Sequence, residues 1–308
     1  MPSRLTSADI EGAAARIRPY VRLTPVIDLG DVVGKGWRLS LKLDTLQPTG
    51  SFKVRGAFSV LTATLVPEAG VVAASGGNFG AAIAHAAGVL GHKATVFVPS
   101  TSPEEKLRSI SGHGADVHVI SGYYADALES SRIWAAETGA FEAHAFDQLE
   151  VVAGQGTCGM EIMDQVPGST SVLVPVGGGG LIAGIANWVR SRARVVGVEP
   201  EACPTMHAAR QAGGPVEVEV GGVAASSLGS SRLGDHAWTA NQWVDASILV
   251  SDDEIIEAQQ WLWETCRIVA EPGASVPVAA LLFERHMPMP GEQVVVVVSG
   301  ANTSGVGL

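Results

Sequence analysis

The segment Val172-Leu173-Val174-Pro175-Val176-Gly177-Gly178-Gly179-Gly180-Leu181-Ile182-Ala183-Gly184-Ile185-Ala186-Asn187-Trp188-Val189 has the order strand, glycine loop, helix. Residues 172–176 are apolar without interruption, which is typical of a buried parallel strand. The apolar residues after the glycines recur at helical spacing. This order predicts an α/β fold, in which helices cover mainly parallel sheets.

The four glycines indicate an anion site. Bare backbone N–H groups at the positive end of a helix bind a phosphate group without a basic side chain. A flexible linker is the other interpretation, but linkers are flanked by polar sequence, and this run lies between two apolar elements. The G-x-G-x-x-G spacing is absent and no Gly-Lys-Ser/Thr follows, so neither a dinucleotide fingerprint nor an ATP-binding loop is predicted.

A lysine within Gln47-Pro48-Thr49-Gly50-Ser51-Phe52-Lys53-Val54-Arg55-Gly56-Ala57 is the candidate reactive group. Most lysines are solvated surface residues. Here Pro48-Thr49-Gly50 breaks the chain, Ser51 is expected to cap a helix, and Phe52 is apolar. Desolvation and the positive helix end would both lower the pKa of Lys53. Such an amine can form a Schiff base with a carbonyl group.

Two further loops follow apolar strands. Residues 70–74 lead into Ser75-Gly76-Gly77-Asn78-Phe79-Gly80 and then an alanine-rich helix over 81–90, an arrangement suited to a small carboxylate. The five valines at 294–298 form the strongest strand signal and end at Ser299. In a parallel sheet, ligands bind at the loops that follow the carboxyl ends of strands. Ser299 is therefore expected at the edge of a site, although a serine at a strand end is more often a turn former.

Together these segments resemble the serine/threonine dehydratase family, which are pyridoxal-phosphate enzymes of fold type II. The matching blocks occur in order over nearly the whole chain: Gly50–Ala57, Gly154–Thr157, Pro175–Gly184, Val198–Pro200, Glu271–Gly273 and Ser299–Gly300. The resemblance implies two three-layer α/β domains with the active site in the cleft between them. We expect a large cofactor domain formed by 1–65 and 147–308, and a small mobile domain at 66–146.

The resemblance also implies the cofactor, pyridoxal 5'-phosphate, and the site residues. Lys53 would be catalytic. The cofactor would contact Phe52, Lys53, Asn78, Gly177, Gly178, Gly179, Gly180, Leu181, Glu271 and Ser299. The substrate would contact Ser75, Gly76, Gly77, Asn78, Phe79 and Ser230.

The expected reaction is β-elimination of a β-hydroxy amino acid, such as L-threonine or L-serine, to a 2-keto acid and ammonia. Ser299, a neutral hydroxyl at the ring nitrogen, would favour elimination over transamination. Phe79 replaces a polar residue of the family and Ser226 replaces an aspartate. These two changes predict a less polar pocket and a preference for larger apolar β-substituents.

Three alternatives remain open. Racemases of this fold use a serine at the position of Gly76, so racemisation should be weak. β-Replacement synthases carry an aspartate directly after the lysine, where this chain has Val54. A non-catalytic binding protein of the same fold is the third alternative, and the intact Lys53, glycine run and Ser299 oppose it.

Composition excludes other classes. The net charge of −11 argues against nucleic-acid binding and offers no basic patch for a membrane. Met1 to Glu11 has no apolar core of the kind a signal peptide needs, so we expect a cytoplasmic protein, and by resemblance a homodimer. In cation-dependent relatives, the glutamate matching Glu199 acts with an acid six residues later. Thr205 stands there, so no metal site is predicted.

Overall fold

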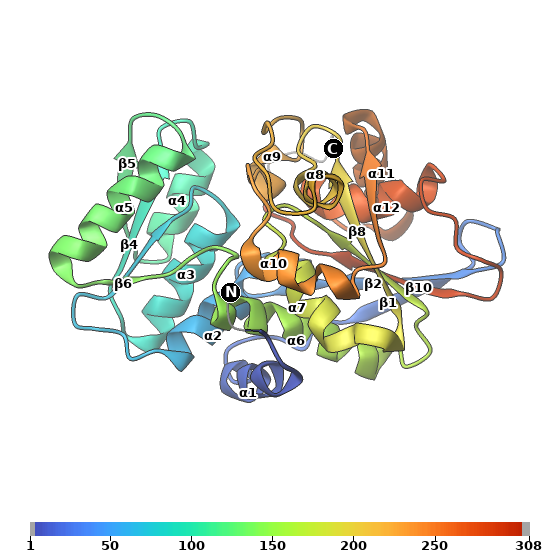
Figure 1. The fold of residues 1–308 in the computed structure, drawn as a ribbon, viewed down its shortest axis with the longest axis horizontal. Helices are drawn as coiled ribbons and strands as arrows, with labels where there is room; N and C mark the ends of the chain where they lie inside the picture. The colour runs from blue at the N-terminus through green and yellow to red at the C-terminus, as the bar shows by residue number, and fades with distance from the viewer. Residues whose placement is uncertain (1–3, 304–308) are drawn as a thin grey trace.

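The computed structural model describes residues 4–303 and contains two β-sheets with helices on both faces (Figure 1). The strands are β1 (Val26–Gly30), β2 (Arg38–Leu43), β3 (Val71–Ala74), β4 (Ala94–Pro99), β5 (Asp116–Ile120), β6 (Phe141–Glu142), β7 (Ser171–Pro175), β8 (Arg194–Pro200), β9 (Ala246–Val250) and β10 (Gln293–Val298). The larger sheet has the order β1-β2-β10-β7-β8-β9 and the smaller sheet has the order β5-β4-β3-β6. Within the described residues, β1 pairs antiparallel with β2, and the other strand pairs are parallel.

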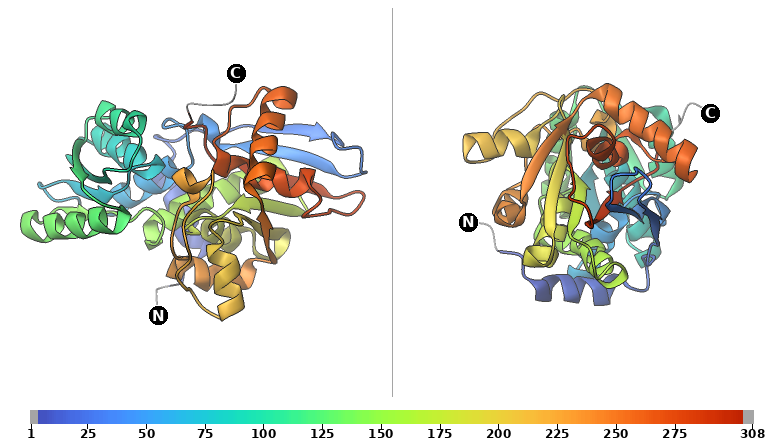
Figure 2. Two further views of the ribbon diagram at one scale, coloured as in Figure 1. Left: turned by 90° about the horizontal axis from the view of Figure 1, so that it is seen from above. Right: turned by 90° about the vertical axis from the view of Figure 1, so that its right-hand side faces the viewer.

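Helices connect most of these strands. They are α1 (Ser7–Ile17), α2 (Lys53–Ala63), α3 (Asn78–Leu90), α4 (Glu104–Gly112), α5 (Tyr124–Thr138), α6 (Leu149–Gln165), α7 (Gly180–Val189), α8 (Thr205–Ala212), α9 (Ala225–Leu228), α10 (Asp235–Ala240), α11 (Asp252–Cys266) and α12 (Pro272–Leu282). Figure 2 shows the two sheets and their helices as two lobes side by side. We call them the large lobe and the small lobe.

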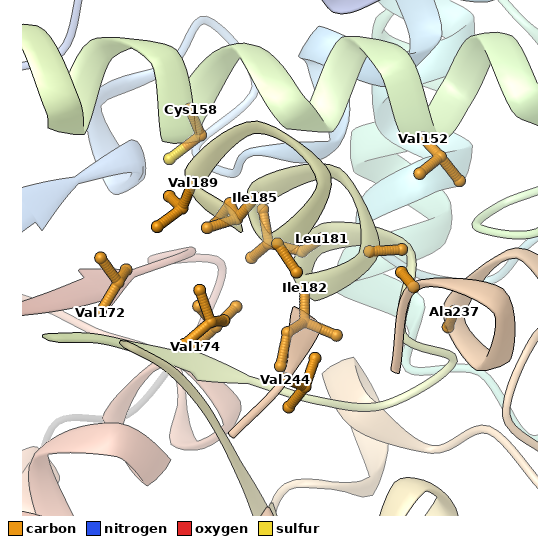
Figure 3. Close-up of a cluster of buried hydrophobic side chains, with 14 of the residues drawn as sticks. Val152, Cys158, Val172, Val174, Leu181, Ile182, Ile185, Val189, Ala237 and Val244 are labelled. Carbon is orange, nitrogen blue, oxygen red and sulfur yellow. The ribbon is translucent and has the colours of Figure 1, made fainter. Parts of the chain in front are cut away.

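The central strands of the large lobe are buried on both faces, as their unbroken apolar sequence predicts. Val295 and Val297 of β10 face one core, which α6 and α7 cover, while Val294, Val296 and Val298 face a second core that α11 and α12 cover. Successive side chains of a strand point to opposite faces of the sheet, so one valine run supplies both cores. Figure 3 shows part of the first core, where Val172 and Val174 of β7 face Ile182 and Ile185 of α7.

The small lobe repeats this three-layer plan on a smaller scale. Val71 and Ala73 of β3 pack with α2, α3 and α4, whereas Val72 of the same strand faces α5 on the other side. Its four strands lie within the range 66–146 that the sequence assigns to the small domain. The mobility of that domain stays a prediction.

A buried ion network anchors helix α2. The Arg55 guanidinium donates to Asp44 Oδ2 at 2.7 Å and Oδ1 at 2.8 Å, and to Glu161 Oε1 at 2.6 Å. Arg55 and Asp44 are fully buried. Removing one partner of such a network costs about 3–5 kcal/mol, because it leaves a buried charge unpaired. The network therefore holds the start of α2, where Lys53 lies, against the large lobe.

Candidate active site

Lys53 is the first residue of α2 and lies in a half-buried, partly apolar position. Its Nζ donates a hydrogen bond to Ala145 O at 3.0 Å, and lies 5.1 Å from the centre of the Phe52 ring and 5.9 Å from that of Phe79. Desolvation lowers the pKa of Lys53 to about 8, although the negative charge of Glu271 acts to raise it. The direction agrees with the expectation from the sequence. A sizeable fraction of this amine is neutral, and so nucleophilic, near pH 7.

The predicted helix cap at Ser51 is wrong. Phe52 is the N-cap residue, and no side chain caps the helix. Ser51 instead pairs with Gly300 in an isolated antiparallel bridge, and Phe52 N donates to Ser299 O at 2.9 Å. The reason is tertiary: the segment before α2 is paired with the end of β10, and the helix therefore begins too late for Ser51 to cap it. This pairing places Ser299 beside Phe52, the residue that precedes Lys53.

The glycine loop 177–180 joins β7 to α7, and Phe146 and Leu228 pack closely against it. A side chain at Gly178 would approach the Phe146 ring to 2.5 Å, one at Gly177 would approach the Leu228 Cα atom to 2.9 Å, and Gly179 has a φ of 85°. The Gly177 carbonyl accepts from Thr205 Oγ1 at 2.5 Å. Among residues 4–303, no side chain caps the start of α7. Because the first N–H groups of a helix have no acceptor within it, this end is suited to an anion.

The crossover loop, residues 144–147, connects Lys53 with the glycine loop. Ala145 accepts the hydrogen bond from Lys53, and Phe146 lies against Gly178. The Asp147 carboxylate accepts from the backbone N–H groups of residues 235 and 236 at 3.0 and 2.9 Å. Sequence reasoning missed this loop because it carries no glycine run or helical periodicity.

Asn78, Glu271 and Asn302 form a hydrogen-bonded group from three distant segments. Asn78 Nδ2 donates to both oxygens of Glu271 at 2.8 and 3.0 Å, and Asn302 Nδ2 donates to Asn78 Oδ1 at 2.9 Å. Burial raises the pKa of Glu271, while the hydrogen bond from Asn78 opposes that rise. Glu271 N also donates to Gly300 O at 3.0 Å, so the group borders the end of β10.

These residues fit the cofactor that the resemblance implies. The start of α7, which follows the glycine loop and has no side-chain cap among the described residues, suits a phosphate group. The half-buried amine of Lys53, which lies close to two aromatic rings, suits an aldehyde group. The Ser51 hydroxyl is buried without a partner among the described residues, two positions before Lys53, so the site has an unused hydrogen-bonding group. The other cofactor contacts expected from the sequence stay predictions: Phe52, Asn78, Leu181, Glu271 and Ser299.

The substrate residues expected from the sequence do not all lie together. A cavity of about 310 Å³ lies between the lobes and includes Gly77 and Asn78 in its lining, together with Lys106, Ser226 and Asn302. Ser75 lies beside this loop, where its Oγ accepts from Gly77 N at 3.3 Å. The lining also contains apolar side chains, Ala81, Pro103 and Ala301, and the expected preference for apolar β-substituents stays a prediction.

Besides Ser75, three other expected substrate residues lie outside that lining. The space beside Gly76 holds the hydroxyl of Ser102. Phe79 is buried in the core of the small lobe. Ser230 Oγ donates to Arg232 O at 2.7 Å, away from the cavity. Their roles in substrate binding stay predictions.

Glu199 is buried, and backbone and side-chain donors of the protein bind its carboxylate. Its carboxylate accepts from Met206 N at 2.7 Å, His207 N at 2.8 Å and Ser247 Oγ at 2.7 Å. Across residues 4–303, no group of three or more histidine, cysteine, aspartate or glutamate residues is placed to hold a metal ion. In the same range no helix has the length and apolar character to cross a membrane.

Comparison with known proteins gives the family. The model of the pyridoxal-phosphate dependent enzyme family matches residues 17–300. An L-threonine ammonia-lyase from Geobacter sulfurreducens is 37% identical over 302 residues, which is 95% of this chain and 74% of that protein. The crystal structure of a threonine deaminase from T.th. has a TM-score of 0.91 at 34% identity, covering 97% of this chain and 99% of that one. The structure of maize serine racemase has a TM-score of 0.91 at 29% identity, covering 98% of this chain and 95% of that one.

These matches confirm the fold and the cofactor expected from the sequence. The two three-layer lobes, the mainly parallel sheets and the cavity between them are those of the fold type II enzymes. This chain belongs to the pyridoxal-phosphate-dependent enzymes and, among them, to the serine/threonine dehydratase family of lyases.

Proposed function

We propose that this lyase deaminates L-threonine, and also L-serine, to the corresponding 2-keto acid and ammonia. One observation carries the proposal: Lys53 is a half-buried amine with a pKa of about 8, on a segment that is hydrogen-bonded to Ser299, and it is joined through the crossover loop to the glycine loop. The names of its relatives, L-threonine ammonia-lyase and threonine deaminase, support the substrate class.

The chemistry assigned to the chain is proton transfer. Bound pyridoxal phosphate supplies the electron sink that makes the Cα proton of the amino acid acidic. Lys53 Nζ takes this proton as a general base, for which its lowered pKa suits it at neutral pH. The Cβ–O bond then breaks, and the hydroxyl group leaves as water with the proton that Lys53 returns. The enamine released from the site hydrolyses to the 2-keto acid and ammonia.

Ser299 would direct the outcome. A hydroxyl group at the ring nitrogen attracts the ring proton less strongly than a carboxylate would, so negative charge at Cα is stabilised less and the hydroxyl group leaves promptly. Backbone contacts hold Ser299 in place, since its carbonyl accepts from Phe52 N at 2.9 Å. This arrangement supports elimination in preference to transamination.

Release of 2-keto acid from L-threonine, L-serine and a β-aryl serine tests the function. We expect turnover of the first two. Lys53→Ala should lower kcat by at least about a hundredfold and abolish the visible absorption of the covalently held cofactor. Lys35→Ala, at a half-exposed lysine on the far side of the large lobe, is the matched control and should behave like the wild type. Normal turnover by Lys53→Ala would contradict this role for the lysine.

Weak racemisation is a second candidate activity, which one observation favours. A side chain at Gly76 would overlap the Ser102 hydroxyl, so a hydroxyl group lies where racemases of this fold carry the serine side chain. We expect a trace of D-serine from L-serine that Ser102→Ala removes while 2-keto acid formation persists. Chiral analysis of the residual substrate measures the amount of D-serine. Equal amounts of D-serine from the wild type and from Ser102→Ala would reject a role for Ser102.

We also propose, by family resemblance, that the enzyme is a cytoplasmic homodimer whose small domain, 66–146, moves on substrate binding. Light scattering of the purified protein tests the dimer. Hydrogen exchange with and without L-threonine tests the motion, since closure should protect the segments that line the cavity, such as α4.

A further inference from the structure

Lys106 crosses the cavity between the lobes. It belongs to α4 of the small lobe, and its Nζ donates to Ser226 O in α9 of the large lobe at 2.8 Å. Both residues line the 310 Å³ cavity together with Asn78 and Asn302. The ammonium group is therefore held inside the cavity by a backbone carbonyl of the opposite lobe.

The ammonium group of Lys106 forms no ion pair. Within residues 4–303, none of the ion pairs includes Lys106. Burial lowers the pKa of Lys106, and the negative charges of Glu271 and of Glu105, which also lines the cavity, act to raise it. An ammonium group has three N–H donors, of which the Ser226 carbonyl accepts one. Donors thus remain for an anion that enters the cavity.

Gly77 is the residue of the loop before α3 that faces this ammonium group. A Cβ atom at Gly77 would lie 4.0 Å from Lys106 Nζ and 3.5 Å from Ser226 O, which are ordinary contact distances, so the absence of a side chain there leaves room beside the lysine. Asn78 and Asn302 border the same space, but their side-chain N–H groups already donate to Glu271, Thr49 and Asn78. The ammonium group of Lys106 is therefore the donor in this space that suits a small anion such as a carboxylate.

We propose that Lys106 binds a carboxylate group of the amino-acid substrate and is a specificity-determining residue of this site. The proposal rests on the proposed function, because it takes the substrate to be an amino acid. The carboxylate has two sources: the α-carboxylate that every amino acid carries, or a second carboxylate on the β-carbon, as in L-threo-3-hydroxyaspartate. In either case the ammonium group gains the charged partner that the protein lacks.

Binding to the holoenzyme separates these sources without requiring turnover. The change in the cofactor's visible spectrum is titrated with L-threonine, L-threo-3-hydroxyaspartate and L-threoninol, which has no carboxylate. Lys106→Met should weaken L-threonine binding by about tenfold or more if the α-carboxylate is the partner, as expected for a lost charged hydrogen bond. It should weaken only the hydroxyaspartate if the second carboxylate is the partner. Binding of L-threoninol should not change in either case.

Lys106→Arg is the conservative variant and should retain most of the affinity. A kinetic split gives a second readout where turnover occurs: Lys106→Met should raise KM and leave kcat within about twofold. The proposal is overturned if Lys106→Met leaves both carboxylate-bearing ligands unchanged, or weakens L-threoninol as much as L-threonine. If the wild type binds amino acids but forms no 2-keto acid, the proposed function fails while the role of Lys106 is still decided.

Discussion

The two strand–glycine–helix loops of this chain, 75–77 and 177–180, share a local sequence pattern but differ in their surroundings. Side chains at Gly178 and Gly180 would approach Phe146 to 2.5 and 2.8 Å, and the Gly177 carbonyl is held by Thr205. In loop 75–77, a side chain at Gly76 would overlap the Ser102 hydroxyl, whereas Gly77 faces the cavity, where a side chain would approach no atom closer than 3.5 Å.

This difference suits the two loops to different ligands. A loop that other segments pack against keeps its N–H groups in one arrangement, which suits a group that never varies, such as the cofactor phosphate. A loop at the edge of a cavity between two lobes can be reshaped by the residues opposite, which suits the substrate. Lys106 and Ser226 are those opposite residues here.

The largest expected effect comes from breaking the supported loop. Gly178→Ala places a Cβ atom against the Phe146 ring, so the loop must shift. We expect the affinity for pyridoxal phosphate to fall by about tenfold or more, since the loss of one phosphate contact costs about 1.4 kcal/mol or above. Equilibrium dialysis of the apoenzyme measures it. Gly168→Ala, where the added atom meets nothing within 4 Å, is the matched control.

The pH dependence of cofactor incorporation measures the pKa of Lys53. The neutral amine attacks the aldehyde, and the pKa of Lys53 is about 8. The rate of reconstitution should therefore rise about fivefold from pH 7 to pH 8 and level off above it. Glu271→Gln removes the charge that raises this pKa, so the curve should move to lower pH. Glu257→Gln, at an exposed glutamate, should leave the curve in place. A midpoint near 10 would mean that burial does not perturb the amine.

A smaller effect is expected at the open loop. Gly77→Ala meets only ordinary contacts, so the fold and the cofactor affinity should be unchanged. The added methyl group narrows the cavity near Lys106, and we expect KM for L-threonine to rise about two- to fivefold, equivalent to under 1 kcal/mol. A loss of cofactor affinity as large as that of Gly178→Ala would remove the distinction between the two loops.

The smallest effect is expected from metal removal. Glu199 already accepts hydrogen bonds from two backbone N–H groups and the Ser247 hydroxyl, and Thr205 holds the glycine loop directly. Treatment with EDTA should therefore change kcat/KM by less than about twofold, because a hard cation needs more free oxygen ligands than this site offers. A large loss that magnesium or calcium restores would show that other oxygens bind a cation.

Local sequence determined the elements of this fold and the nature of its loops. The strand expected at 172–176 is β7 (Ser171–Pro175), the helix expected over 81–90 lies within α3 (Asn78–Leu90), and the valine run is β10. Periodicity and glycine runs act over a few residues, so they can be read without knowledge of the fold. The family motif around Lys53 is local in the same sense.

Tertiary packing decided which groups meet. Ala145, Asn302 and Lys106 reach the site from the crossover loop, the end of the chain and the opposite lobe, and no local pattern marks them. The same packing removed Ser51 from its expected cap by pairing it with Gly300. Contacts between segments so far apart in the sequence depend on how two cores dock, and that docking is a property of whole surfaces that no short stretch of sequence contains.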